Sequence, residues 1–338
     1  MRAIIYKKSL KPELKEIEFP TRIPRGSSLV KVKSCGLCGS DMHKLTSKID
    51  PSRYLSNFIL GHEISGIVVK SQDKNLINKK VAVNPLIKCG VCSSCVKKNE
   101  ELCLNLKSIG KELPGGFCEY VIVPNKNLVP IKSKITFDEI CLVDTIAVGV
   151  HILQLIKKIK PDIKKVLIIG DGAVALCTLL VLNSYNIQGY VVGKNNFNLE
   201  KVIELGGRVI EKNNIESQSF DCVIETVGRN QSDTLNLAIN SVKKNGCIIV
   251  AGVYGNNPIN SVLLRELFYK QVTLRGSNSY SYWNKEDEFR IAIKLLENNK
   301  LENLNKLISH KLPLEKFEEG IALMKNKNKN TIRVVFNP

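Results

Sequence analysis

The pattern of apolar and polar residues divides the chain into two regions of different character. From Met1 to about Leu142, short alternating or apolar stretches are broken by proline and glycine, as in a compact β-rich domain. This pattern predicts strands at Arg2–Lys7, Glu13–Phe19, Ser28–Ser34, Ile64–Lys70, Lys80–Asn84, Phe117–Val123 and Asn127–Ile131.

The second region alternates strands with helices. A buried strand, Lys165–Ile169, runs into the glycine-rich segment Gly170–Ala175, and the apolar stretch that follows to Leu182 predicts a helix. Further strands are predicted at Gly189–Val192, Asp221–Glu225, Cys247–Val250 and Val272–Gly276, with helices at Leu199–Leu205 and Asp233–Val242. Repeated strand–helix units predict a parallel, doubly wound sheet, and the fold class is therefore α/β.

Length and composition describe an ordinary globular chain. At 338 residues it is long enough for two domains, with 43% apolar and 24% charged residues. No apolar run reaches the roughly 18 residues of a membrane span. The N-terminal stretch lacks a signal-peptide pattern, and the eleven cysteines suit a reducing compartment. We therefore expect a cytoplasmic protein that does not interact with a membrane.

The formal charge of +18 raises the question of nucleic-acid binding. The excess comes from 40 lysines against 10 arginines, and the lysines are spread along the chain. A nucleic-acid groove needs clustered basic residues, with arginine and stacking aromatics for base recognition. We therefore expect no nucleic-acid partner.

Four cysteines lie close together in the first region. Cys89, Cys92, Cys95 and Cys103 follow the spacing C-x2-C-x2-C-x7-C. Four thiolates complete the tetrahedral coordination of zinc and leave no open position, so such a site is structural. A disulfide pair or a redox pair of cysteines is the alternative, which four cysteines in one short segment do not favour.

A second set of candidate metal ligands precedes this cluster. Cys38 lies in the segment Gly36–His43, and His62 lies between Gly61 and Glu63. One thiolate and one imidazole leave room for a third side chain and an open position, as a catalytic zinc requires. Taken alone, the two residues are more typical of a buried thiol and a hydrogen-bonded core histidine. The flanking glycines, the four-cysteine segment and the later nucleotide-binding pattern favour zinc instead.

Four segments together resemble the zinc-dependent medium-chain alcohol and polyol dehydrogenases. They are GLCGSDMH (Gly36–His43), GHEISGIVV (Gly61–Val69), the four-cysteine segment and GGFCEYVIVP (Gly115–Pro124). These segments occur in the same order as in the family, and the resemblance covers nearly the whole chain. It implies a GroES-like catalytic domain over residues 1–145 with a structural zinc lobe at 89–103, a Rossmann nucleotide-binding domain over 146–284, and a return to the catalytic domain over 285–338.

The resemblance also implies a set of catalytic residues. Cys38 and His62 match the ligands of the catalytic zinc, and the third ligand is expected in the segment Val143–His151. Many relatives have Glu-Pro at the position of Asp144 and Thr145, and a subset of secondary alcohol dehydrogenases has Asp there. Asp144 is therefore our choice, with Glu63 as an alternative or exchanging ligand. Ser40 matches the hydroxyl of the family's proton relay, and His43 is a candidate to pass the proton outward. Two zinc ions per chain are expected.

The glycine-rich segment predicts a dinucleotide cofactor. Gly170, Gly172, Ala173 and Val174 lie between a strand and a helix, where a pyrophosphate binds the helix N-terminus. An NAD site ends its second strand with an acid, whereas this strand ends in Gly193 and Lys194, and no acid occurs between Asp171 and Glu200. This predicts a preference for NADP(H) over NAD(H). The predicted cofactor-binding set is completed by Thr226, Gly252, Val253 and Ser277.

These expectations define a function class with several members. We expect hydride transfer between NADP(H) and a secondary alcohol or ketone, with a polyol or sugar-alcohol phosphate as substrate. A threonine dehydrogenase-like activity and a catalytically silent relative are the alternatives. The substrate pocket is expected to be edged by residues 44–58, Ile109–Glu112 and Ser277–Tyr280. A homodimer or homotetramer is expected, because Leu267–Gly276 has the pattern of the last strand of the nucleotide sheet.

Overall fold

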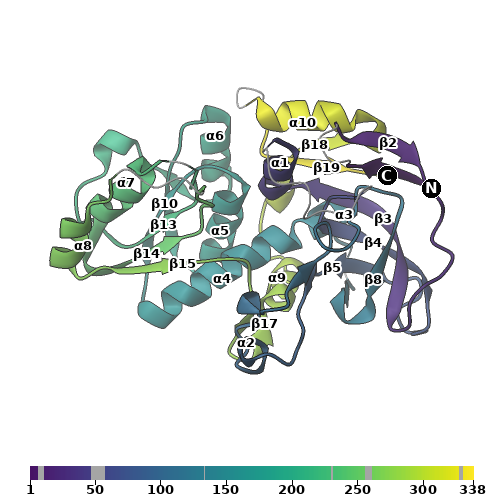
Figure 1. The fold of residues 1–338 in the computed structure, drawn as a ribbon. Coiled ribbons are helices and arrows are strands. Elements are labelled where there is room, and N and C mark those ends of the chain that lie inside the picture. The colour runs from purple at the N-terminus through teal and green to yellow at the C-terminus, as the bar shows by residue number, and fades with distance from the viewer. Residues whose placement is uncertain (7–10, 47–57, 133, 230, 256–260, 327–329) are drawn as a thin grey trace. The chain divides into compact units, whose positions relative to one another are not determined.

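The computed structural model describes residues 1–6, 11–46, 58–132, 134–229, 231–255, 261–326 and 330–338. It divides into two compact units (Figure 1). The first comprises Met1–Asp144, Ala292–Asn298 and Ile308–Pro338, and the second comprises Thr145–Ile291 and Asn299–Leu307. The predicted return to the catalytic domain from residue 285 therefore differs in detail, because residues 285–291 and 299–307 group with the second unit. One reason is Glu288, a buried carboxylate that accepts hydrogen bonds within that unit, including one from the backbone N–H of Ser281.

The first unit is built on a seven-stranded sheet. Its strands run in the order β18-β19-β3-β4-β5-β9, and β8 also pairs with β3. Each strand predicted in this region is present with its ends shifted: β1 Arg2–Ile5, β2 Glu13–Glu16, β3 Ser27–Leu37, β4 Glu63–Ser71, β5 Lys80–Val83, β8 Tyr120–Pro124 and β9 Leu128–Pro130. Other elements are α1 Gly39–Thr46, β6 Leu86–Ile87, α2 Ser93–Val96, β7 Lys107–Ser108, α3 Phe137–Cys141, β18 Ile308–Leu312, α10 Phe317–Lys325 and β19 Arg333–Phe336.

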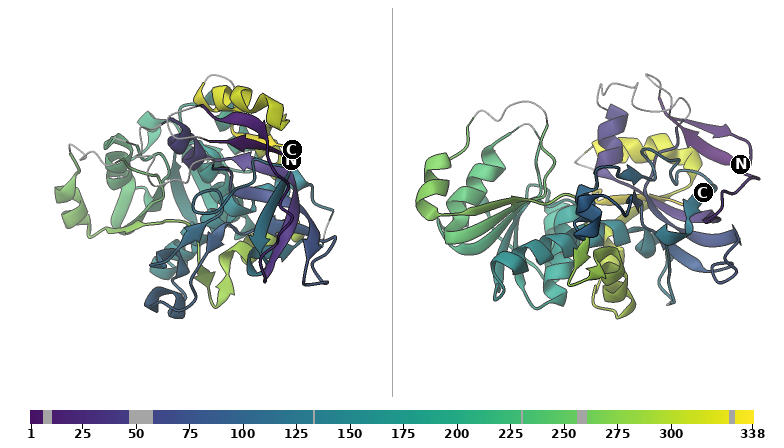
Figure 2. Two further views of the ribbon diagram at one scale, coloured as in Figure 1. Left: turned by 45° about the vertical axis from the view of Figure 1, so that its right-hand side comes forward. Right: turned by 60° about the horizontal axis from the view of Figure 1, so that its bottom comes forward.

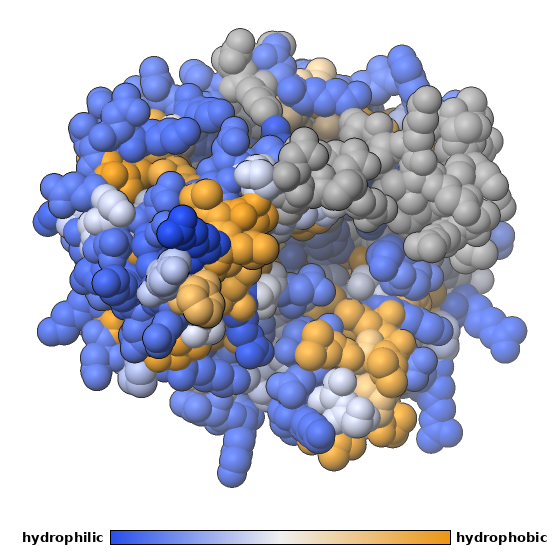
Figure 3. Space-filling model, turned by 60° about the vertical axis from the view of Figure 1, so that its left-hand side comes forward, coloured by the Kyte–Doolittle hydropathy of each residue, from blue (hydrophilic) through white to orange (hydrophobic). Residues whose placement is uncertain are grey.

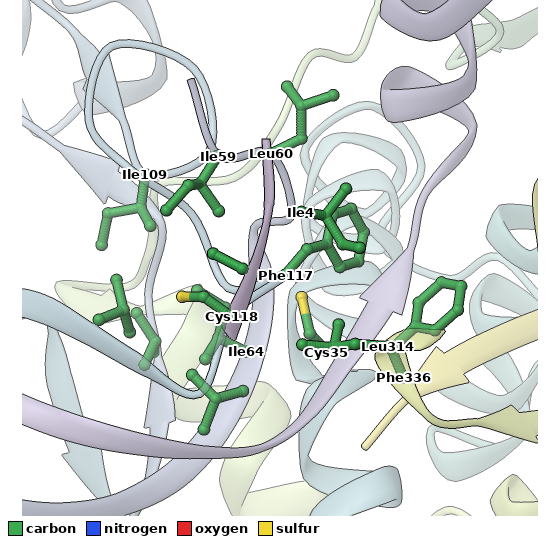
Figure 4. Close-up of a cluster of buried hydrophobic side chains, with 14 of the residues drawn as sticks. Ile4, Cys35, Ile59, Leu60, Ile64, Ile109, Phe117, Cys118, Leu314 and Phe336 are labelled. Atoms are coloured by element: carbon green, nitrogen blue, oxygen red, sulfur yellow. The ribbon is translucent and has the colours of Figure 1, made fainter. Parts of the chain in front are cut away.

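The core of the first unit lies between this sheet and the segments that cover it. Figure 4 shows buried side chains from the strands, such as Ile4, Cys35 and Ile64, packed with Phe117 and Phe336. The rings of Phe117 and Phe336 meet edge to face with centroids 5.5 Å apart. Packing of this kind stabilises the ends of β3 and β4, from which the candidate site is built.

The second unit holds a six-stranded parallel sheet in the order β12-β11-β10-β13-β14-β15. Helices lie on both faces of this sheet (Figure 2), and the strand order reverses direction around the first strand, β10. The elements are β10 Lys165–Ile169, α5 Ala173–Ser184, β11 Gln188–Val192, α6 Asn196–Glu204, β12 Arg208–Val209, β13 Phe220–Glu225, α7 Asp233–Ser241, β14 Val242–Val250, α8 Leu264–Lys270 and β15 Thr273–Gly276. The predicted α/β fold class, with a β-rich first unit and a parallel, doubly wound sheet in the second, is therefore confirmed.

The last predicted strand is partly wrong. Within Leu267–Gly276, residues up to Lys270 belong to helix α8, and only Thr273–Gly276 form the edge strand β15. The Lys270 ammonium is buried and donates to the carbonyls of Ile239 and Asn240, which anchors the end of the helix. Gln271 then adopts the left-handed conformation (φ 52°) and ends it.

Two further helices precede and follow the strands of the second unit's sheet along the chain. Helix α4 spans Val143–Ile159 and α9 spans Glu288–Glu297, while β16 (Tyr282–Trp283) and β17 (Glu286–Asp287) form a short pair before α9. Among the described residues, no helix combines the length and apolar character needed to cross a bilayer.

Candidate active site and cofactor site

The ends of two paired strands bring Cys38 and His62 together. Strands β3 and β4 are antiparallel with Gly36 opposite Glu63, so the residue just after β3 and the residue just before β4 lie at the same end of the pair. The ligand atoms of Cys38, His62 and Glu63 all lie within 4.8 Å of one another. A thiolate, an imidazole and a carboxylate at this spacing form a donor set that fits zinc.

Two glycines make this approach of the strands possible. Gly61 has φ +91°, and a Cβ there would lie 2.8 Å from the Cys35 sulfur. At Gly36, a Cβ would overlap the Glu63 carboxylate. Larger residues at these positions would push His62 and Glu63 out of place.

Asp41 orients both sequence-predicted ligands. Its side chain is fully buried; Oδ2 accepts a hydrogen bond from the Cys38 N–H at 3.1 Å, and Oδ1 lies 3.4 Å from His62 Nδ1. Burial would lower the pKa of His62, but Asp41 and Cys38 raise it well above its usual value. Because Nδ1 faces Asp41, the Nε2 atom is presented on the other side, as in metal-binding histidines supported by a carboxylate.

Two carboxylates are candidates for the third ligand. Asp144, at the start of α4, places Oδ2 4.0 Å from His62 Nε2, and both side chains are about one-seventh exposed (14% and 16%). Glu63 is fully buried and its Oε1 forms a 2.9 Å ion pair with Arg333, which is also buried. The ion pair already engages Glu63, and the nitrogen of His62 turned away from Asp41 faces Asp144.

The two residues of the predicted proton relay lie on helix α1. Ser40 and His43 are three residues apart and hence on one face of the helix, and both are exposed. Asp41, on the same helix, is buried. The helix therefore has an exposed hydroxyl and imidazole next to the buried carboxylate that holds His62.

The four-cysteine segment forms a separate cluster. The sulfur atoms of Cys89, Cys92, Cys95 and Cys103 all lie within 4.8 Å of one another, and the short pair β6–β7 closes the base of the lobe. The N–H of Cys92 donates to Cys89 Sγ, and the N–H of Cys89 donates to Cys103 Sγ, both at 3.4 Å. Backbone N–H groups of Val91 and Cys92 lower the pKa of Cys89 to about 6. Four sulfurs with this support fit a closed, structural zinc site.

The predicted cofactor residues gather at one edge of the parallel sheet. They follow the carboxyl ends of β10, β11, β13, β14 and β15, where ligands of such sheets bind. Gly170 has φ +115° and packs on Thr226, whose Oγ1 donates to the Ile169 carbonyl at 2.8 Å. Gly172 caps α5 and has open space around it, while Ala173 and Val174 form its first turn.

The later strand ends complete this edge. The N–H of Gly252 donates to the Glu225 carbonyl at 2.9 Å, and the next residue, Val253, is 70% exposed. The Ser277 hydroxyl is buried and has no hydrogen-bond partner among the described residues. An unsatisfied buried hydroxyl at the carboxyl edge of the sheet fits a site that accepts a polar cofactor.

One acidic side chain changes the interpretation of Gly193 and Lys194. No acid lies between the end of β11 and Glu200 in the sequence, but the Asp171 carboxylate reaches over from the glycine-rich loop. Its Oδ2 accepts hydrogen bonds from the N–H groups of Lys194 at 2.7 Å and Asn195 at 2.8 Å. The prediction that the end of β11 has no acidic side chain near it is therefore wrong, because the carboxylate of Asp171 from the neighbouring loop lies there.

The three segments expected to edge the substrate pocket differ in what the structure describes. Residues 47–57 lie outside the described residues. Ile109 and Gly110 belong to the first unit, and the Gly110 carbonyl accepts a hydrogen bond from Lys44 Nζ at 3.0 Å. Ser277–Tyr280 belong to the second unit. Besides Asp171, sequence reasoning missed Arg333, because a contact between the last strand and Glu63 has no local signal.

Comparison with known families places the chain. A model described as the alcohol dehydrogenase GroES-like domain matches residues 24–133, and one described as the glucose dehydrogenase C-terminus matches residues 151–337, more than half of the chain. The first match lies within the first unit, and the second covers most of the second unit together with the two later segments of the first. The chain belongs to the zinc-type medium-chain alcohol and polyol dehydrogenases.

Individual relatives are distant but extend over nearly the full length. The chain is 26% identical to galactitol 1-phosphate 5-dehydrogenase of Escherichia coli K12 over 310 residues, 86% of this chain and 87% of that protein. It is also 26% identical to L-threonine 3-dehydrogenase of Bacillus subtilis over 333 residues, 93% and 92% of the two chains. A protein of Sinorhizobium meliloti 1021, solved bound to NADP, superposes with a TM-score of 0.88 at 23% identity over 100% of this chain and 99% of that one.

Proposed function

We propose that this protein is a zinc-dependent oxidoreductase that transfers a hydride between a nicotinamide dinucleotide and a secondary alcohol or ketone, with a polyol or sugar-alcohol phosphate as substrate. The observation that carries the proposal is the cluster of Cys38, His62 and Glu63, in which the buried Asp41 orients Cys38 and His62. A chain that binds alcohols without reacting them has no need of this combination. The cluster therefore argues against a catalytically silent relative.

Each residue has a defined part in the reaction. Cys38, His62 and Asp144 would hold a catalytic zinc, with Glu63 as the alternative ligand, and the four cysteines of the lobe would hold a structural one. A catalytic zinc supplies a Lewis acid that acidifies an alcohol and polarises a carbonyl. Ser40 and His43, exposed on α1, carry the proton between the substrate hydroxyl and solvent.

The cofactor would bind at the carboxyl edge of the parallel sheet. There the glycine-rich loop and the first turn of α5 receive the pyrophosphate. The Ser277 hydroxyl is available to a polar group of the cofactor.

Two lysines support an anionic substrate. Lys44 lies on helix α1, and its Nζ donates a hydrogen bond to the Gly110 carbonyl. Burial lowers the pKa of Lys44, and the positive charge of Lys111, the residue after Gly110, lowers it further. Lys44 lies within electrostatic range of Cys38, and although Lys111 is paired with Glu112, two ammonium groups in this part of the unit favour a phosphorylated polyol over a neutral one. A relative named for galactitol 1-phosphate agrees with this choice.

The preference for NADP(H) stays a prediction. Gly193 leaves no acid of its own at the end of β11, and the exposed Lys194 adds a positive charge, and both features support it. Asp171 opposes it, because its carboxylate lies at the same strand end.

A homodimer or homotetramer is also part of the proposal. All four residues of the edge strand β15 are exposed, and an unpaired parallel-sheet edge is an aggregation hazard that pairing with a second copy removes. Apolar side chains are exposed at Leu274 on this strand and at Leu264, Phe268 and Tyr269 on the preceding helix α8. Figure 3 shows apolar patches on the side of the molecule that carries α7 and α8.

The eleven free cysteines suit the reducing cytoplasm, where we place the enzyme.

A substrate screen tests the proposal. Polyols, their phosphates, simple secondary alcohols and L-threonine are each offered with NAD and with NADP, and nicotinamide absorbance is followed. We expect turnover of a polyol phosphate, which Lys44→Gln slows mainly through a higher KM. Turnover of threonine alone would favour the amino-alcohol activity that the Bacillus subtilis relative suggests. No turnover of any substrate by the zinc-loaded protein would contradict the proposal.

A further inference from the structure

Asp171 occupies an unusual position in the second unit. Strands β10 and β11 are parallel with Ile169 opposite Val192, so the loop after β10 and the turn after β11 lie side by side. Asp171, between the two loop glycines, crosses this gap and accepts hydrogen bonds from the first two backbone N–H groups after Gly193. Its own carbonyl accepts a hydrogen bond from Asn198 Nδ2 at 2.9 Å, which ties the loop to helix α6.

Gly193 and Asp171 form one arrangement. A Cβ at residue 193 would overlap the Asp171 carboxylate and lie 2.6 Å from the Asp171 Cβ. The missing side chain at residue 193 therefore makes room for the carboxylate of residue 171. An acid at the end of the second strand is replaced by an acid that arrives from the first loop.

The place is the one where the adenosine ribose meets the protein. In a Rossmann sheet, the loop after the first strand holds the pyrophosphate, and the end of the second strand meets the ribose 2′ position. A 2′-phosphate needs backbone N–H donors and positive charge there. Asp171 already occupies the N–H groups of Lys194 and Asn195, and it brings a negative charge.

We propose that Asp171 is a specificity-determining residue that accepts a hydrogen bond from the ribose 2′-hydroxyl of NAD(H) and selects against the 2′-phosphate of NADP(H). This rests on the proposed function, because it requires a nicotinamide dinucleotide at the sheet edge. Lys194 attracts the 2′-phosphate and works against Asp171. Its exposed ammonium is screened by solvent, so its effect is the smaller one.

The test compares Asp171→Asn with the wild type. The ratio of kcat/KM for NADP to kcat/KM for NAD is expected to rise at least about tenfold, because the variant removes a like charge and keeps one acceptor oxygen. Asp171→Ser, which removes the carboxylate entirely, should raise this ratio as well. Lys194→Gln should lower the ratio, by a smaller factor than the rise expected for Asp171→Asn. Asp162→Asn is the matched control, since it removes an exposed carboxylate just before β10, at the opposite end of that strand, and should leave the ratio unchanged.

Binding measurements separate this inference from the proposed function. ADP-ribose and 2′-phospho-ADP-ribose are titrated calorimetrically into the full-length wild type and the Asp171 variants, after melting curves have shown that each is folded. A selective gain in affinity for the 2′-phosphorylated ligand in the variants supports the role of Asp171. If both ligands bind but their affinity ratio changes less than twofold in both variants, the inference is wrong and the cofactor site stands. If neither binds the wild type, the cofactor site and the inference both fail.

Discussion

The first unit carries two cysteine clusters that differ in what surrounds the sulfur atoms. In the lobe, four thiols meet one another and receive hydrogen bonds from backbone N–H groups of the same segment. At the ends of β3 and β4, one thiol meets an imidazole and carboxylates, and the support comes from the side chains of Asp41 and Arg333. The backbone N–H groups that donate to the lobe's sulfur atoms are in place whenever the lobe folds. Asp41 and Arg333 instead add charges next to His62 and Glu63, and a set with one thiol leaves a coordination position open. The first arrangement suits stability, and the second suits chemistry.

Cys38→Ser is expected to have the largest effect on activity. The variant loses a thiolate of the open cluster, which consists of Cys38, His62 and the nearby carboxylates of Glu63 and Asp144. The value of kcat/KM should fall at least about a thousandfold, because a Lewis acid contributes several kcal/mol to such reactions. The melting temperature should change by only about 2 °C, since the fold does not depend on this ligand. A Cys38→Ser enzyme with near-normal activity would contradict the assignment of the open cluster.

Cys95→Ser should show the opposite profile. A structural zinc contributes to the folding free energy, so losing one of four thiolates should lower the melting temperature by about 10 °C or more. Ser93→Ala, an exposed hydroxyl of α2 in the same lobe, is the matched control and should leave it unchanged. Equal melting temperatures for Cys95→Ser and the control would show that the lobe holds no stabilising metal.

Asp144→Asn and Glu63→Gln decide the third ligand of the open cluster. We expect Asp144→Asn to weaken zinc binding about tenfold to a hundredfold or more while the protein stays stable. Glu63→Gln should instead destabilise the fold, because it leaves the buried Arg333 guanidinium without its ionised partner. Zinc titration and thermal melting of both variants distinguish these outcomes. Loss of zinc from Glu63→Gln alone would make Glu63 the ligand.

Asp41→Asn should have the smallest of these effects. The amide keeps the shape of the side chain but removes the charge that supports His62, so we expect zinc affinity and kcat/KM to fall about tenfold to a hundredfold. Asp73→Asn, an exposed carboxylate of the same unit, serves as the control. An Asp41→Asn variant with wild-type zinc affinity would show that His62 does not need this carboxylate.

Local pattern predicts the elements of this chain well, and it predicts contacts between distant segments poorly. Strand β10 is found at Lys165–Ile169 as predicted, because a short apolar run before a glycine-rich turn is a strong local signal. The part of α8 from Leu267 to Lys270 was predicted as strand, because a short apolar segment fits either structure and the buried contact of Lys270 decides it. Asp171 was passed over for the same reason, since its function depends on β11, twenty residues further along.

The number of zinc ions per chain tests the difference between the two clusters most directly. Elemental analysis of the full-length protein, purified without chelator, is carried out on the wild type, Cys38→Ser and Cys95→Ser. The account predicts two zinc ions in the wild type and one in each variant, with activity lost in Cys38→Ser and stability lost in Cys95→Ser. One zinc or none in the wild type, or loss of both ions from Cys38→Ser, would contradict it.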